Sequence, residues 1–95
     1  MIKVYKLNLE AKEIEKFNQN NRFSIRHIHL MLNQEIPTHS SSSDKVVIVL
    51  EGNIDFTASG ETVKMISGDF VVLEPEEKHS LKGNEESQVL VVLHK

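Results

Sequence analysis

The sequence predicts an all-β fold, a jelly-roll sandwich of two sheets closed like a barrel, with about eight strands. Two observations support this prediction. Short runs of β-branched and other apolar residues recur at spacings of roughly 8–12 residues, which is typical of a sandwich or barrel. Turn residues, chiefly glycine, asparagine and proline, separate these runs and allow the chain to reverse.

The expected strands follow one another along most of the chain. They cover residues 2–9, 23–32, 45–51, 54–58, 62–66, 70–73, 79–82 and 88–94. The strand over 45–51 is β-branched or apolar at every interior position, so we expect it to pack on both faces. Gly52-Asn53 is the signal of a tight hairpin between two apolar runs. Residues 33–43 form a polar connection that Pro37 interrupts.

The N-terminal part of the chain has a different pattern. Between residues 10 and 21, Ile14 and Phe17 lie three residues apart on one face, which predicts one or two helical turns or an ordered loop. The segment 1–9 alternates charged and bulky residues, and its apolar side chains would form an exposed edge in a lone barrel. We therefore expect a homodimer in which a second copy covers this edge.

Length and composition narrow the classes of protein and partner. A chain of 95 residues fits one domain, which we place over 1–95, with the barrel over about 23–94 and an N-terminal strand and turn over 1–22. The net charge is −3 without a basic cluster, so no nucleic-acid partner is expected. There is no cysteine for disulfide or thiolate chemistry. The apolar runs are too short to span a membrane and no secretory signal is evident, so we expect a cytoplasmic protein without a membrane partner.

Two stretches of the sequence, one with His39 and Gly52 and one with Gly68 and His79, resemble the two motifs of the cupin superfamily. The first motif contains two histidines separated by one residue, a glutamate and a glycine at fixed distances; here His39 and Gly52 match it. The second is a Gly-Asp turn followed by a strand, a proline and a histidine; here it begins at Gly68 and ends at His79. The resemblance covers roughly residues 23–94 and implies a cupin barrel whose pocket opens near the 33–45 loop.

The resemblance also implies a metal site, and the chain departs from it at two positions. Metal-binding cupins use three histidines and one carboxylate, a donor set that suits iron, manganese, nickel or zinc. His39 and His79 match two of these ligands and are the candidate metal ligands. Ser41 stands at the position of another histidine, and Lys45 at that of the glutamate. A hydroxyl is a poor ligand and an ammonium repels a cation, so these two residues disfavour a divalent transition metal as cofactor. Strand alternation also turns Asp44 away from the face of Lys45.

Three functions remain open, and the sequence identifies no catalytic residue. The preferred hypothesis is a small-molecule-binding cupin with a degenerate or absent metal site, in which His39, Ser41, Lys45 and His79 contact a small polar or anionic ligand. The first alternative is a metal-dependent enzyme of the oxygenase or isomerase type that uses His39 and His79. The second is a structural or interaction module whose barrel is filled by side chains. An inward-pointing Lys45 would favour a carboxylate or phosphate, and burial would lower its pKa. Alternatively its ammonium reaches out to solvent.

A second pair of histidines lies on the strand over residues 23–32. His27 and His29 are two residues apart and therefore share one face of that strand. The opposite face carries Ile28 and Leu30, which makes it the expected core side. We therefore expect His27 and His29 to be exposed or at an interface rather than to ligate a metal.

Overall fold

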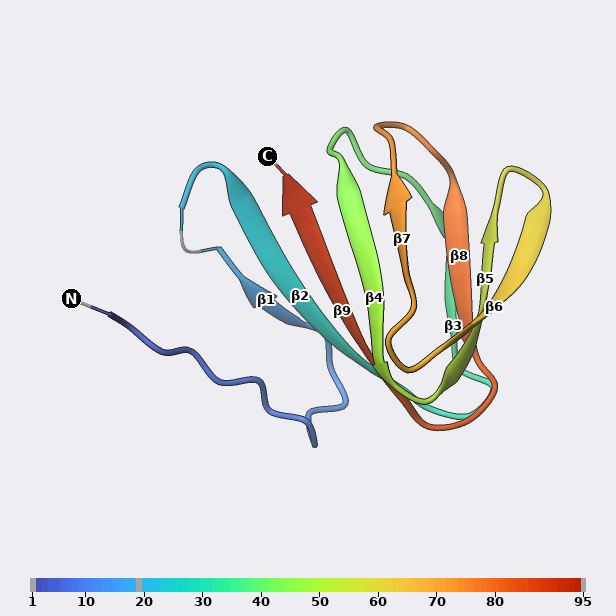
Figure 1. Ribbon diagram of the computed structural model, residues 1–95, viewed down its shortest axis with the longest axis horizontal. Helices are drawn as coiled ribbons and strands as arrows, with labels where there is room; N and C mark the ends of the chain where they lie inside the picture. Colours follow the sequence, from blue (N-terminus) through green and yellow to red (C-terminus); the bar gives the residue numbers. More distant parts are fainter. Residues whose placement is uncertain (1, 19, 95) are drawn as a thin grey trace.

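The computed structural model describes residues 2–18 and 20–94, which form nine strands in two antiparallel sheets (Figure 1). The five-stranded sheet has the order β1-β2-β9-β4-β7, made of β1 (Glu15–Phe17), β2 (Phe23–Leu30), β9 (Ser87–His94), β4 (Lys45–Glu51) and β7 (Phe70–Leu73). The four-stranded sheet has the order β3-β8-β5-β6, made of β3 (Glu35–His39), β8 (His79–Gly83), β5 (Asn53–Ala58) and β6 (Glu61–Ile66). Within these residues there is no helix, and so none long and apolar enough to cross a membrane. The predicted all-β double-sheet fold is confirmed.

The hydrophobic core fills the space between the two sheets. Side chains alternate along each strand, so that in β4 Lys45, Val47 and Val49 are buried inside while Val46 and Ile48 are half-buried on the outer face. The buried apolar residues come from both sheets: Ile28, Leu30, Val47, Val49, Ile54, Phe56, Met65, Leu73, Leu81, Val89, Val91 and Leu93. Lys45 thus lies on the inner face, where apolar residues dominate.

The hairpin between β4 and β5 fixes one end of the sandwich. Gly52 has a φ of 107°, a left-handed conformation that glycine adopts readily. A β-carbon at this position would collide with the side chain and backbone of Ser87. The Ser87 hydroxyl accepts a hydrogen bond from the Asn53 amide at 3.0 Å. The turn after β4 is therefore joined to the start of β9.

The strand expected over residues 2–9 is absent from the part of that segment that the structure describes, residues 2–9. The beginning of the segment extends away from the body (Figure 1), whereas Asn8 and Leu9 contact Glu15 and Gln88. Ile2 and Val4 are 92% and 77% exposed, and no neighbouring strand covers them. The helical turn is replaced by β1, which pairs with β2. The connection over 33–43 also contains a strand, β3, which pairs with β8.

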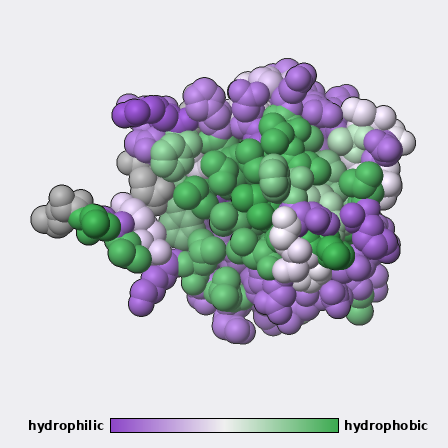
Figure 2. Space-filling model, viewed as in Figure 1, coloured by the Kyte–Doolittle hydropathy of each residue, from purple (hydrophilic) through white to green (hydrophobic). Residues whose placement is uncertain are grey.

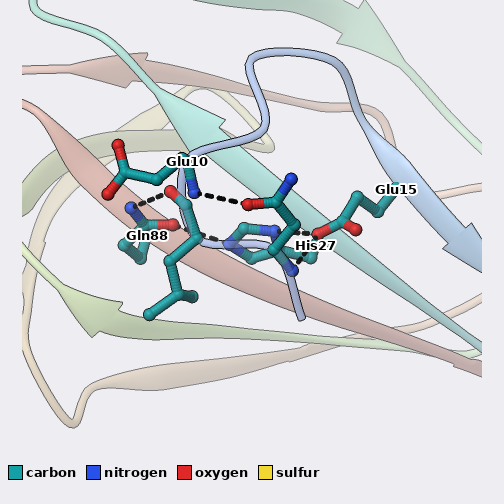
Figure 3. Close-up of polar contacts among 6 residues, drawn as sticks. Glu10, Glu15, His27 and Gln88 are labelled. Atoms are coloured by element: carbon teal, nitrogen blue, oxygen red, sulfur yellow. Dashed lines mark hydrogen bonds and ion pairs between the residues drawn. The ribbon is translucent and has the colours of Figure 1, made fainter. Parts of the chain in front are cut away.

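His27 and His29 are buried, which corrects the expectation that they face solvent. Their side chains are 0% and 6% exposed, although they lie on the outer face of the five-stranded sheet. The segment before β1 folds back over that face. His27 Nδ1 lies 2.8 Å from Glu15 Oε1, and His27 Nε2 lies 2.6 Å from Gln88 Oε1 (Figure 3). Gln88 in turn donates a hydrogen bond of 3.0 Å to the carbonyl of Leu9.

Candidate functional site

Three strands bring the candidate residues together at one end of the sandwich. His39 ends β3, His79 begins β8, and the two residues are register partners across the four-stranded sheet. Lys45 begins β4 in the opposite sheet and points inward. Residues 34 positions apart in the chain therefore meet at the mouth of the barrel, as the two sequence motifs imply.

The two imidazole rings converge on the Lys45 ammonium. Lys45 Nζ lies 3.2 Å from His79 Nε2 and 3.5 Å from His39 Nε2. The ring centroids of the two histidines are 4.2 Å apart. Lys45 and His79 are only 4% and 3% exposed, whereas His39 is half-buried. The expectation that Lys45 points inward agrees with this geometry, and the alternative in which it reaches solvent does not.

Backbone carbonyls determine which nitrogen of each ring carries a proton. His39 Nδ1 lies 2.8 Å from the carbonyl of Pro37, and His79 Nδ1 lies 2.9 Å from the carbonyl of Glu77. A carbonyl oxygen only accepts, so in both rings Nδ1 donates. Each Nε2 then has a lone pair directed toward Lys45 and accepts a hydrogen bond from its ammonium. One cation is thus held between two neutral acceptors.

A small cavity of about 60 Å³ lies beside these three residues. Its walls are mostly aliphatic side chains from both sheets, and Arg26 is the fourth polar residue that lines it. Sequence reasoning missed Arg26. A signal was present, because strand alternation places Arg26 on the same face as Ile28, the expected core side.

The cavity is electropositive and contains no acid. Arg26 Nε is buried and has no hydrogen-bond partner. The ion pairs found among the described residues all involve other histidines, and none involves Arg26 or Lys45. No carboxylate lines the cavity. Two cationic side chains therefore share a largely apolar space without a compensating negative charge.

The electrostatic surroundings shift the pKa of two groups. Burial lowers the pKa of Lys45 below its ordinary value of 10.5, and the positive charge of Arg26 lowers it further. Burial also lowers the pKa of His79 below 6.5, which outweighs the opposing effect of its hydrogen bond to the Glu77 carbonyl. Both shifts favour the uncharged form of the side chain.

Ser41 lies apart from this group. It is half-buried, and its hydroxyl donates a hydrogen bond of 3.2 Å to the carbonyl of Ser43. It does not line the cavity. The structure therefore brings together His39, Lys45 and His79 from the expected ligand-binding set but not Ser41, and it adds Arg26.

The residues present do not fit a divalent metal. Metal-ligating histidines commonly donate their second nitrogen to a backbone carbonyl, as His39 and His79 do here. However, the point on which their Nε2 atoms converge is occupied by the ammonium of Lys45. Among residues 2–18 and 20–94 there is no group of three or more histidine, cysteine or acidic side chains able to hold a metal. The donor set consists of two neutral imidazoles and a cation.

A larger hollow of about 380 Å³ lies on the polar side of the four-stranded sheet. Thr57, Thr62 and Lys82 are among the residues that line it, and a hydrogen bond of 2.8 Å joins the two threonine hydroxyls. None of its charged side chains is buried. We assign the chemistry to the smaller cavity, because only that one contains buried charged and titratable groups.

Comparisons with known proteins agree with this architecture. The family model described as Cupin domain matches residues 26–94. SPY1581 from Streptococcus pyogenes, a conserved protein of unknown function, is 27% identical with a TM-score of 0.81, covering 100% of this chain and 90% of that one. An RmlC-like cupin from Desulfovibrio desulfuricans is 23% identical with a TM-score of 0.84, covering 99% and 97%. KdgF from Halomonas sp. is 14% identical with a TM-score of 0.83, covering 98% and 94%.

A search of curated proteins found no match. The structural similarities at less than 25% identity support the fold alone, because the cupin barrel supports unrelated functions. The family match includes both motif regions and every strand from β3 to β9. On this evidence the chain belongs to the cupin family.

Proposed function

We propose that this cupin binds a small carboxylate in the cavity between its two sheets. The observation that supports the proposal is the pair of cations, Lys45 and Arg26, that line one cavity without an acidic partner. A buried charge is costly unless it is paired, so this arrangement favours an anionic ligand. The ligand supplies the negative charge that the cavity walls lack.

The hydrogen-bond inventory supports the same ligand class. An ammonium has three donors, and His39 and His79 accept two of those on Lys45, which leaves one for a ligand. Arg26 contributes an unpartnered Nε, and a guanidinium edge matches the two oxygens of a carboxylate. Charge-assisted hydrogen bonds of this type are stronger than neutral ones.

The size of the cavity limits the ligand. Its volume of about 60 Å³ equals about two waters at a liquid share of about 30 Å³ each. That is about the size of a carboxylate group alone, so the carbon chain of the ligand has to extend out of the cavity along its aliphatic walls. A tetrahedral phosphate is larger than a carboxylate group and has no apolar part, so we favour the carboxylate.

The test is a titration of the protein with acetate, propionate and phosphate, followed by NMR of the ligand and of the histidine rings. We expect saturable acetate binding that weakens about tenfold or more in Lys45→Met and in Arg26→Met. The exposed Lys82 provides a matched control, and Lys82→Met should bind as the wild type does. Acetate binding that survives both cavity substitutions, or preference for phosphate, would overturn the proposal.

The uncovered apolar surface supports a second proposal, that two copies form a homodimer. Figure 2 shows apolar side chains gathered over β4, β7 and β9 on the outer face of the five-stranded sheet. Phe70 and Val72 on β7 are 63% and 66% exposed there. Ile2 and Val4 in the extended N-terminal segment are also uncovered, and a second copy would cover both surfaces. Sedimentation equilibrium should show a dimer that Val72→Lys weakens, and a wild-type monomer at all concentrations would refute it.

A further inference from the structure

We propose that Lys45 acts as a nucleophile that condenses with the carbonyl group of a small 2-oxo acid to form an imine. This inference rests on the proposed carboxylate binding, because the carboxylate of the 2-oxo acid would be the anion held beside Arg26. A 2-oxo acid carries its carbonyl next to its carboxylate. One ligand can therefore engage both cationic residues of the cavity in different ways.

The position of the amine suits this role. Lys45 is buried to 4% exposure, yet it lines the cavity, so a bound molecule can reach Nζ while bulk water is largely excluded. The two Nε2 atoms of His79 and His39, at 3.2 Å and 3.5 Å from Nζ, are acceptors within or near the range of direct proton transfer. A nucleophile with a base in hydrogen-bond reach is the usual arrangement of covalent catalysis.

The surroundings also make the free amine accessible. Reactive lysines occur in apolar pockets or beside a second cation, since both conditions release the proton. Lys45 meets both conditions, because aliphatic side chains line the cavity and Arg26 shares it. The lowered pKa of Lys45 agrees with this geometry. Exposed lysines such as Lys64 and Lys82 lack these surroundings.

The reaction needs no oxidant or reductant. An imidazole Nε2 takes one proton from the Lys45 ammonium, and the amine lone pair attacks the carbonyl carbon of the 2-oxo acid. A carbon–nitrogen bond forms, and the carbonyl oxygen takes the proton back from the imidazolium to give a carbinolamine with a protonated nitrogen. That nitrogen loses a proton, the hydroxyl gains one and leaves as water, and the C=N double bond forms. The sum is ammonium plus ketone giving protonated imine plus one water.

Reductive trapping tests this inference. The folded wild-type protein is incubated with pyruvate at neutral pH, reduced with cyanoborohydride, and digested so that adducts can be located by mass spectrometry. We expect the adduct at Lys45 to form at least about tenfold faster than at Lys64 or Lys82, which serve as internal controls. Lys45→Arg keeps the charge but lacks the nucleophile, so it should lose this adduct. Arg26→Met should slow it.

The outcomes separate this inference from the proposed function. Acetate binding without a Lys45 adduct would overturn the imine and leave carboxylate binding intact. If the protein neither binds acetate nor forms the Lys45 adduct, both the carboxylate binding and the imine are overturned. Labelling spread evenly over the exposed lysines, or unchanged trapping in Arg26→Met, would also contradict the inference. Circular dichroism of the two variants confirms that they are folded before the trapping is compared.

Discussion

The two buried histidine sites of this protein differ in what surrounds the ring. Inside the barrel, His39 and His79 each donate from Nδ1 to a backbone carbonyl and present Nε2 to an ammonium. On the outer face, His27 meets oxygen atoms at both nitrogens, from Glu15 and Gln88. At the first site one nitrogen of each ring faces an ammonium, whereas at the second both nitrogens of one ring face oxygen atoms.

A second contact of Gln88 agrees with this arrangement. Its Nε2 donates to the Leu9 carbonyl, so its Oε1 faces His27 and can only accept (Figure 3). Glu15 Oε1 accepts from the other nitrogen of His27 and from the Asn8 amide. The same residue type therefore faces an ammonium in the barrel and lies between a carboxylate and an amide oxygen outside it. The partner atoms, rather than burial alone, determine the role of each ring.

The largest expected effect in this comparison is the loss of His27. His27→Ala removes a fully buried ring and leaves Glu15 and Gln88 without their partner, so we expect a loss of about 3 kcal/mol in the free energy of unfolding. Urea denaturation provides the measurement. His94, which is 69% exposed, is the matched control, and His94→Ala should change the free energy by less than about 0.5 kcal/mol. Equal effects of the two substitutions would show that the His27 network does not stabilise the fold.

A charge reversal at Lys45, inside the barrel, should give the site of His39 and His79 an affinity for divalent metals. Lys45→Glu replaces the ammonium with a carboxylate beside two imidazole lone pairs, a donor set of the kind found in zinc sites. We expect the affinity for Zn²⁺ or Ni²⁺ to rise about tenfold or more, close to 1.4 kcal/mol, over that of the wild type. Calorimetric titration measures it, with Lys82→Glu as control. Equal metal binding by the wild type and Lys45→Glu would show that the ammonium does not exclude the metal.

The pH dependence of stability should reveal the neutral ring of His79. Its pKa is lowered in the folded state, so as pH falls below 6.5 the unfolded chain takes up the proton first. The free energy of unfolding then decreases as pH falls, with a slope of at most about 1.4 kcal/mol per pH unit, until the folded pKa is reached. Urea denaturation of the wild type and of His79→Gln between about pH 5 and 7 isolates this contribution. The groups that act on His79 are Lys45, His39 and Glu77, and all three remain in the variant. An identical slope in both proteins would contradict the assignment.

Substitution of His29 should have the smallest effect on the free energy of unfolding. It is a neighbour of His27 on the same strand face and is almost as buried, but neither of its ring nitrogens has a hydrogen-bond partner. Its Nε2 lies 3.2 Å from the exposed Glu86 carboxylate without the alignment of a hydrogen bond. His29→Leu keeps the volume and removes an unsatisfied polar group, so its stability should stay within about 1 kcal/mol of the wild type or rise. A loss as large as that of His27→Ala would mean that the two rings are equivalent.

Much of the fold was predictable because its signals are local. The strands β4 and β7 have the predicted bounds, since apolar runs bounded by turn residues leave few alternatives. Sequence patterns did not predict the structure where a segment depends on contacts with residues far away in the sequence. The alternating segment 2–9 has no neighbouring strand in one copy, and β3 forms despite Pro37 because β8 lies beside it. Local pattern could not show that residues 8–17 cover His27.

The candidate site was predictable in part for a similar reason. Motif spacing identified His39, Lys45 and His79, and the structure places Lys45 Nζ within 3.5 Å of Nε2 of both histidines. It could not give the direction of the Ser41 hydroxyl, which depends on a loop. Arg26 lies outside both motifs, so motif spacing could not identify it. Only the alternation along its strand, which places it on the face of Ile28, pointed to the cavity.

The position of β9 has a consequence for how the chain is made. This strand, the last in the sequence, lies between β2 and β4, which are not paired with each other (Figure 1). During synthesis β2 therefore cannot pair with β9 until residues 87–94 have left the ribosome. The contact between Gln88 and His27 also forms only after that. Pairing between such distant segments slows folding and leaves strand edges open in the meantime. A segment that emerges earlier is thus fixed in place by one that emerges later.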